Sequence, residues 1–336
     1  MDKNIEKKKE AEYLLKMAKK CEKEEKYMES STHYSHAGQL FREIGEKKGL
    51  DVCKKKITEM NKLVSEHEFK NFSFAQKIEE KDAKEIENYI KNLSKKSLSD
   101  VLKTIAYSER FSPKIETAKN TANKTMPLMM QLASTYAVDD KGNTIRGSDN
   151  GTEMWLRKMY GMQLQISSKT YLIPLFKLLI KNKKVTKDKL YRFINKSNII
   201  ENERRNLILK GLESFLKQDY ISSLHILTPQ FEGVFLNVSS VLGINTIKVN
   251  RGQKITTQAI TFSEEHLDSS EFQEKWGKDY CELINYILFR PLGMKIRHKV
   301  AHGEIQSEEC NFFTCLLVIF LFIIISAKLK NAEPEK

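Results

Sequence analysis

Apolar residues recur at helical spacing along most of the chain, and the first 70 residues show this pattern twice. A first predicted helix has its apolar face at Ala11, Leu14, Leu15, Ala18 and Cys21. A second has its apolar face at Tyr27, Tyr34, Ala37, Leu40, Phe41 and Ile44, and Gly45 is a residue type that commonly ends a helix. We therefore expect a helical hairpin over residues 1–70.

The alternation of small and aromatic residues within 1–70 resembles a tetratricopeptide hairpin. No second copy follows at the period of about 34 residues that such repeats require. We therefore expect a helical cap or docking arm, and the N-terminal helices could contact a protein partner.

Residues 71–195 predict a helical middle region. Apolar positions at helical spacing run from Ile78 to Leu93 and again from Leu98 to Ile105, with further helices from Met154 and around 171–180. Between them, residues 138–152 are dense in Asp, Asn and Gly, which predicts a polar surface loop. This stretch lacks the spacing and the terminal Glu of a calcium-binding EF-hand loop.

Residues 196–336 form the most regular part of the pattern. Helices are predicted at Leu207–Leu216, Leu224–Leu242 and Tyr280–Leu288, and the β-branched, polar stretch 244–262 predicts a loop or small hairpin. Several helices with short connections within roughly 130 residues are typical of a helical bundle. The chain as a whole is therefore predicted to be all-α, with a C-terminal bundle preceded by additional helical segments.

Residues 312–327 are almost continuously apolar. Sixteen residues fall short of the roughly 20 needed to span a bilayer. A terminal helix buried on all sides by its own domain or by a dimer partner is the preferred interpretation, so a membrane partner is not expected. A membrane-associated helical scaffold is the alternative.

The formal net charge of +13 favours polyanionic partners such as RNA, DNA or an anionic membrane surface. Because the lysines are interleaved with glutamates, solvated helix faces explain the same composition. Five cysteines without a CxxC pair, and no signal peptide, predict reduced thiols and a cytoplasmic protein.

Segment 294–303 concentrates the residues that can carry chemistry. It contains the cations Lys295, Arg297 and Lys299 and the imidazoles His298 and His302. Histidine titrates near neutrality and suits general acid–base catalysis, while the planar fork of arginine matches a phosphate. RNA cleavage needs a base for the 2′-hydroxyl, a cation for the phosphorane and an acid for the 5′-oxygen, and it requires no metal.

The spacing of these residues restricts how they can act together. His298 and His302 share one face of a helix, whereas Arg297 and His302 lie about 140° apart around an ideal helix. One straight helix is therefore a poor active site. The segment needs either a helix end near Gly303 or a second copy of the motif across a two-fold dimer interface.

Other site chemistries find less support. Two histidines four residues apart could bind a metal, but segment 294–303 has no complementary Asp or Glu, so no metal site is expected. The chain contains no Walker loop, no GxGxxG motif and no GxSxG elbow, so no nucleotide or other cofactor is expected.

Arg297-His298-x-x-x-His302 resembles the R-(polar)-x(3–5)-H signature of the HEPN superfamily. The wider C-terminal sequence resembles a bacterial branch of that superfamily with an R-N-x-x-A-H-G motif before an apolar helix. The matching blocks are residues 210–232 and 294–303, and the resemblance covers about 200–330. This chain departs from that branch in two ways: His298 replaces the usual Asn, and Leu236 stands where an Arg is common.

The resemblance implies a four-helix core within residues 196–336, a homodimer with the active site at its interface, and metal-independent RNA endonuclease activity. Arg297 and His302 carry over as catalytic residues and His298 as the polar residue between them, with Lys299 as a supporting cation. Glu232 matches an acidic position in the upstream helix. It could orient Arg297, or it could be an exposed residue of an amphipathic helix.

Two functions therefore remain open. The first is an RNA endonuclease, in the role of a toxin or antiphage-defence effector. The second is a non-catalytic HEPN domain that binds RNA, a nucleotide or a protein partner through the same groove, because fold alone does not determine activity.

Overall fold

The protein is described by a computed structural model that covers residues 2–68, 79–128, 135–138, 144–148, 151–196, 198–251, 255–259 and 262–329. It divides into two compact units. The smaller unit consists of Met1–Lys77 and Ala133–Asn150, and the larger of Ile78–Leu132 and Gly151–Lys336. Helices dominate both units, with two short antiparallel hairpins among the described residues, so the fold class is all-α, as predicted.

The smaller unit has three consecutive helices where the sequence predicted two. They are α1 (Asp2–Lys23), α2 (Tyr27–Glu43) and α3 (Lys47–Leu63), and α3 continues into the π-helical turn Val64–Glu68. Phe41 of α2 packs with Ala11 of α1 and Cys53 of α3. Because α3 supplies part of this core, the hairpin expected over residues 1–70 is a three-helix unit.

A short hairpin occupies part of the stretch that was expected to be a polar loop. Strands β1 (Thr135–Val138) and β2 (Thr144–Ser148) pair antiparallel, with Thr135 opposite Ser148. The loop expected over 138–152 is therefore wrong for Val138 and Thr144–Ser148, which lie in strands, and for Thr152, which begins a helix. Residues 139–143 and 149–150 lie outside the described residues.

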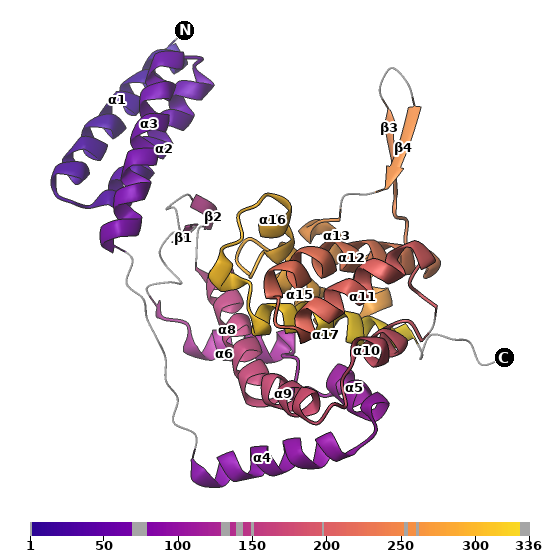
Figure 1. The fold of residues 1–336 in the computed structure, drawn as a ribbon. Helices are drawn as coiled ribbons and strands as arrows, with labels where there is room; N and C mark the ends of the chain where they lie inside the picture. Colours follow the sequence, from indigo (N-terminus) through magenta and orange to yellow (C-terminus); the bar gives the residue numbers. More distant parts are fainter. Residues whose placement is uncertain are drawn as a thin grey trace. The chain divides into compact units, whose positions relative to one another are not determined.

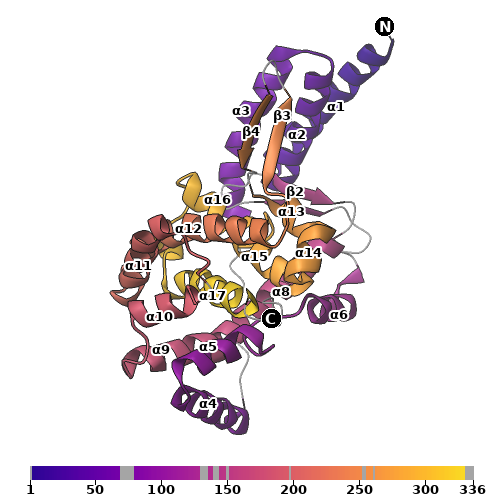
Figure 2. The ribbon, with the colours of Figure 1, turned by 90° about the vertical axis from the view of Figure 1, so that its right-hand side faces the viewer.

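The larger unit contains most of the helices, which Figures 1 and 2 show from two sides. They are α4 (Glu80–Lys95), α5 (Leu98–Tyr107), α6 (Ile115–Thr125), α8 (Thr152–Ser167), η2 (Ser168–Leu172), α9 (Ile173–Lys181), α10 (Lys187–Ile194), α11 (Asn202–Leu216), α12 (Tyr220–Val241), α13 (Glu264–Asp268), α14 (Ser270–Trp276), α15 (Lys278–Ile284), η3 (Asn285–Phe289), α16 (Ile296–Ala301), η4 (Ser307–Glu309) and α17 (Phe312–Leu329).

Several of these helices begin at side chains that cap them. Ser97 accepts a hydrogen bond from the backbone N–H of Asp100 at the start of α5, and Thr186 does the same for Lys189 at the start of α10. Asp219 accepts from the N–H of Ser222 at the start of α12. Such caps satisfy N–H groups that have no partner within the helix, and they fix where each helix starts.

Strands β3 (Ile247–Arg251) and β4 (Ile255–Ala259) form the second hairpin, with Ile247 opposite Ala259. This confirms the small hairpin that was one alternative for residues 244–262. In Figure 1 it stands out from the helical body between α12 and α13.

The core of the larger unit is built around α17. In Figures 1 and 2 this helix lies among α5, α10 and α12, and it packs against all three. Residues Thr314–Ala327 are buried without interruption. The helix is long and apolar enough to cross a membrane, with a mean hydropathy of 2.6, but 78% of it is buried inside the protein. The buried terminal helix predicted from the sequence is therefore present.

One hydrophobic cluster runs through the larger unit from Ile90 to Ile325. It includes Leu190 before and Ile208 after the domain boundary predicted at 195/196. The middle region and the C-terminal bundle therefore share a core in this structure. All five cysteines are free and buried, as expected for reduced thiols.

Candidate functional site

The turn that leads into the motif is fixed by the backbone of the preceding helical segment. The N–H of Met294 donates to the carbonyl oxygen of Tyr286 at 2.8 Å, and that of Gly293 donates to the carbonyl of Arg290 at 2.9 Å. A Cβ on Gly293 would lie 2.2 Å from the same Tyr286 oxygen, so only glycine fits there. Lys295 then adopts a left-handed conformation with φ 53°, and α16 begins.

A buried arginine anchors this turn. Arg290 is 1% exposed and its guanidinium pairs with the carboxylates of Glu264, Asp268 and Glu282. Burial raises the pKa of Glu282, although Arg290 and Arg157 act in the opposite direction. Three carboxylates around one guanidinium tie α13 and α15 to Arg290, which lies four residues before the motif segment.

Helix α16 carries the motif on a short element whose side chains are mostly half-buried. Of its six residues only Ile296 is buried, at 2% exposure. The helix ends at Ala301, and Gly303 follows with φ 65°, in the left-handed region. The helix end that the spacing of Arg297 and His302 required near Gly303 is therefore present, and His302 lies at that end.

Arg297 is held by Glu232 from α12. Its Nε donates to Oε2 of Glu232 at 2.9 Å, and its Nη2 lies 3.4 Å from Oε1. The side chains are 27% and 15% exposed, respectively, so the pair is partly shielded from solvent. Of the two interpretations of Glu232 left open by the sequence, the charge partner of Arg297 is the one observed.

The two histidines lie against each other on one side of α16. Their ring centroids are 4.3 Å apart, with the ring planes inclined by 44°. The N–H of His302 donates to the carbonyl oxygen of His298 at 3.0 Å, which continues the helical pattern to the C-cap. The spacing of four residues therefore brings both imidazoles to one face, as predicted.

The surroundings of His298 favour its neutral form. Partial burial lowers its pKa from 6.5, and the nearby charge of Lys295 lowers it further. The carboxylate of Glu304, 3.6 Å from Nε2, acts in the opposite direction and does not overcome the other two. His298 is therefore mostly neutral at pH 7 and able to accept a proton.

Lys299 is engaged away from the histidines. Its ammonium pairs with the carboxylate of Glu309, and its carbonyl oxygen accepts hydrogen bonds from the N–H groups of Glu304 and Ile305. Lys299, predicted as a supporting cation, therefore stabilises the loop after Gly303.

Sequence reasoning missed three contributors to the site: Glu304, Glu309 and Arg290. Glu304 and Glu309 follow the motif directly, and a search for acidic residues just beyond Gly303 would have found them. The three carboxylates around Arg290 come from positions 264, 268 and 282, and no local spacing marks them as partners.

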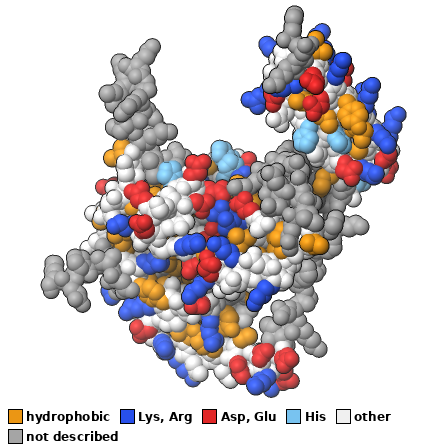
Figure 3. Space-filling view, turned by 180° about the vertical axis from the view of Figure 1, so that it is seen from behind, with side chains coloured by type: hydrophobic (Ala, Val, Ile, Leu, Met, Phe, Trp, Pro, Cys, Tyr) orange, Lys and Arg blue, Asp and Glu red, His pale blue; other side chains and the backbone are white. Residues whose placement is uncertain are grey.

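The surface of the larger unit carries both signs of charge (Figure 3). Figure 3 shows Lys and Arg side chains interspersed with Asp and Glu over the larger unit on the face that it draws. In the part of the chain that the structure describes, no group of three or more His, Cys, Asp or Glu has a geometry suited to a metal ion. The absence of a metal from the reaction remains a prediction made from the motif.

Comparison of the chain with protein-family models, curated proteins and solved structures finds no match. The HEPN resemblance therefore rests on the sequence blocks at 210–232 and 294–303.

Proposed function

We propose that the larger unit is a metal-independent RNA endonuclease of HEPN type, with Arg297, His298 and His302 at its active site. The observation that carries the proposal is the arrangement around α16. A guanidinium held by Glu232 and two imidazoles in ring contact belong to one short helix and its C-cap. These are the groups that cleavage by an internal 2′-hydroxyl needs.

The proposed reaction follows from the properties of these side chains. One imidazole removes the proton of the 2′-hydroxyl, whose oxygen attacks the adjacent phosphorus. The bond from phosphorus to the 5′-oxygen breaks, and that oxygen receives a proton from a protonated imidazole. The products are a 2′,3′-cyclic phosphate and a free 5′-hydroxyl, and Arg297 offsets the negative charge of the phosphorane.

The lowered pKa of His298 suits it to the role of base, because the neutral imidazole predominates at pH 7. His302, at the exposed helix end, is then the acid within one protomer. In a homodimer formed through the C-terminal domain, the partner's copy of the motif would share one groove with this copy. Arg297 and His302 are essential for cleavage in both arrangements, within one protomer and across the homodimer.

The biological role that accompanies this activity is a cytoplasmic toxin or antiphage-defence effector acting on RNA. A protein partner at the N-terminal helices would restrain or direct it. The toxin or defence role follows from the resemblance, whereas the protein partner is proposed from the docking-arm pattern of residues 1–70.

A second function is favoured by one observation. The guanidinium of Arg297 is already occupied by the carboxylate of Glu232, so binding a phosphate there requires the two anions to share it. A non-catalytic domain that binds its partner without placing a phosphate on Arg297 would keep this pair intact.

The deciding experiment incubates the full-length protein and its Arg297→Ala/His302→Ala variant with total RNA and sequences the new ends. We expect the wild type to produce 2′,3′-cyclic phosphate ends. The variant should lose cleavage by roughly 10²-fold to 10⁴-fold, the usual contribution of general acid–base catalysis. Equal cleavage by both proteins would refute the assignment, and RNA binding without cleavage by the wild type would favour the second function.

Two matched variants separate chemistry from folding. His225→Ala removes an exposed imidazole of α12 whose Nδ1 contacts the carbonyl of Ile221, and it should leave cleavage unchanged. Glu232→Gln removes the charge that holds Arg297 and should lower cleavage about tenfold, while Glu213→Gln, at a surface pair with Lys217, should not.

A further inference from the structure

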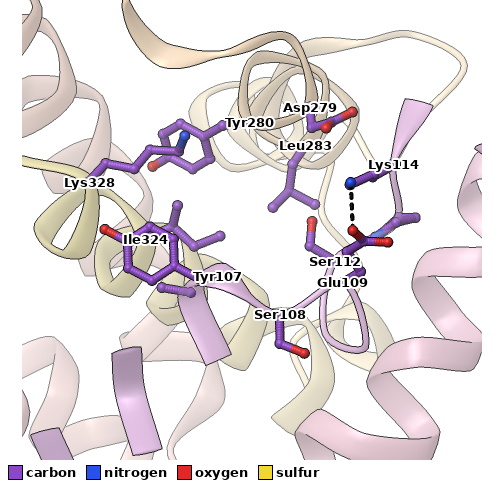
Figure 4. A pocket seen from close by; sticks show the side chains of 12 residues that line it. Tyr107, Ser108, Glu109, Ser112, Lys114, Asp279, Tyr280, Leu283, Ile324 and Lys328 are labelled. Atoms are coloured by element: carbon purple, nitrogen blue, oxygen red, sulfur yellow. Dashed lines mark ion pairs between the residues drawn. The ribbon is translucent and has the colours of Figure 1, made fainter. Parts of the chain in front are cut away.

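A pocket of about 170 Å³ lies in the larger unit, away from the residues of the proposed site. It is bounded by the end of α5 and the loop that follows, by α15 and by the last turns of α17. Figure 4 shows Lys328 and Tyr280 on one side and the pair of Lys114 and Glu109 on the other. Leu283 and Ile324 supply apolar side chains to its wall.

Lys328 brings an ammonium group into this pocket without a counter-ion. Its Nζ lies 5.7 Å from the centre of the Tyr280 ring and 3.6 Å from the position that a Cβ on Gly277 would take. Among the described residues, no carboxylate lies within ion-pair distance of Lys328 and its ammonium donates no hydrogen bond. An aromatic face offsets only part of the cost of removing an ammonium from water.

The other charged side chains of the pocket are already engaged. Glu109 and Lys114 pair with each other at 2.6 Å. Asp279 accepts a hydrogen bond from the N–H of Ile115 at 2.9 Å, at the start of α6, where the helix dipole favours a negative charge. Lys328 is therefore the charged side chain of the lining that has no ion-pair partner among the described residues.

Burial lowers the pKa of Lys328, and Cys281 and Asp279 oppose this only in part. The folded protein thus places the ammonium of Lys328 in surroundings that disfavour its positive charge. An anion entering the pocket would gain a charge-assisted hydrogen bond and would relieve this cost.

The size and lining of the pocket restrict the anion. An engineered protein cavity of about 150 Å³ accommodates benzene, so this pocket has room for about one ring or a short branched chain. Leu283, Ile324 and the Tyr280 ring offer apolar contact that inorganic phosphate cannot use. A phosphate would also bring more negative charge beside Asp279 and Glu109 than one lysine offsets.

We propose that this pocket binds a small carboxylic acid with an apolar body of about one ring, whose carboxylate pairs with the ammonium of Lys328. The site does not depend on the proposed ribonuclease activity, since none of its residues belongs to segment 294–303. It gives the larger unit a second ligand site, specific for an organic acid.

Calorimetric titration of the full-length protein tests this proposal with benzoate, with its neutral analogue benzamide and with inorganic phosphate. We expect benzoate to bind with one-to-one stoichiometry, and benzamide and phosphate to bind at least about tenfold more weakly. Lys328→Met keeps the apolar stem and removes the charge, so it should reduce benzoate affinity to the level of benzamide. Lys217→Met, at an exposed ion pair on α11, should leave it unchanged.

Three results would overturn the proposal: no saturable benzoate binding below about 10 mM, equal binding of benzoate and benzamide, or unchanged affinity in Lys328→Met. A measurement on the wild type covers the case in which the variant fails to fold. Reductive methylation followed by peptide mass spectrometry should show benzoate slowing the modification of Lys328 and not that of Lys217. Equal protection of both lysines would also contradict the proposal.

Discussion

Helices α16 and α17 follow each other in the chain and have opposite surroundings. In α16 only Ile296 is buried, and the helix is six residues long. In α17 every residue from Thr314 to Ala327 is buried. Comparing them shows two kinds of helix: the long apolar α17 builds the core, and the short, partly buried α16 carries residues of the proposed site.

The two helices are also held in different ways. Contacts on several sides fix α17: Phe322 meets Phe231 of α12 edge to face, the hydroxyl of Tyr280 donates to the carbonyl of Leu321, and that of Ser326 donates to the carbonyl of Ile194. A few polar and backbone interactions fix α16, chiefly the pair of Arg297 with Glu232. Substitutions in α17 should therefore act on folding, and those around α16 on local geometry.

The largest effect is expected from Phe322→Ala in α17. Phe322 is fully buried, so its truncation should leave a cavity and lower the free energy of unfolding by about 3–5 kcal/mol. Leu207→Ala, at a residue 47% exposed on α11, should change it by no more than about 0.5 kcal/mol. Denaturant unfolding measures both, and similar values would mean that α17 is not the centre of the core.

A smaller effect is expected at the end of α16. Nothing lies within 4 Å of a Cβ on Gly303, so Gly303→Ala should act only through its φ of 65° and cost about 1–2 kcal/mol. Gly303→Asn should cost about half as much, since asparagine tolerates this conformation better. Equal unfolding free energies for wild type, Ala and Asn would show that α16 does not require a left-handed end.

The smallest effect concerns the protonation of His298. Its ring should titrate below 6.5 in an NMR experiment, and Glu304→Gln should lower this pKa further because the opposing negative charge is removed. Lys295→Met should raise it, and Glu308→Gln should leave it unchanged. A rise in Glu304→Gln would contradict the assigned role of that carboxylate.

The same shift has a consequence for stability. The unfolded chain protonates His298 near 6.5, while the folded protein resists protonation until a lower pH. The unfolded state therefore binds more protons in this window, and the contribution of His298 to stability falls as the pH drops through it. Above about 6.5 the contribution no longer changes with pH.

Much of the fold could be predicted because the apolar spacing is regular. The apolar terminal helix follows from local composition. The hairpin within 244–262 was one of two alternatives, and the helix end at Gly303 was one of two arrangements that the spacing of Arg297 and His302 allowed. The third helix of the smaller unit was missed although Leu50, Cys53, Ile57 and Met60 lie at helical spacing, because lysines are interspersed among them in Lys47–Leu63. Strand β2 was missed because Thr144–Ser148 lies among Asp, Asn and Gly residues that usually form turns.

The sequence by itself determined the helical class, the apolar character of residues 312–327 and the residue types gathered in segment 294–303. These depend on residue type and on spacing within a few turns of helix, which local physics controls. The tertiary structure decided that Glu232 holds Arg297, that Arg290 gathers carboxylates from positions 264, 268 and 282, and that Lys328 faces a pocket without a counter-ion. Contacts between residues far apart in the chain depend on how the helices pack, and no local pattern records that packing.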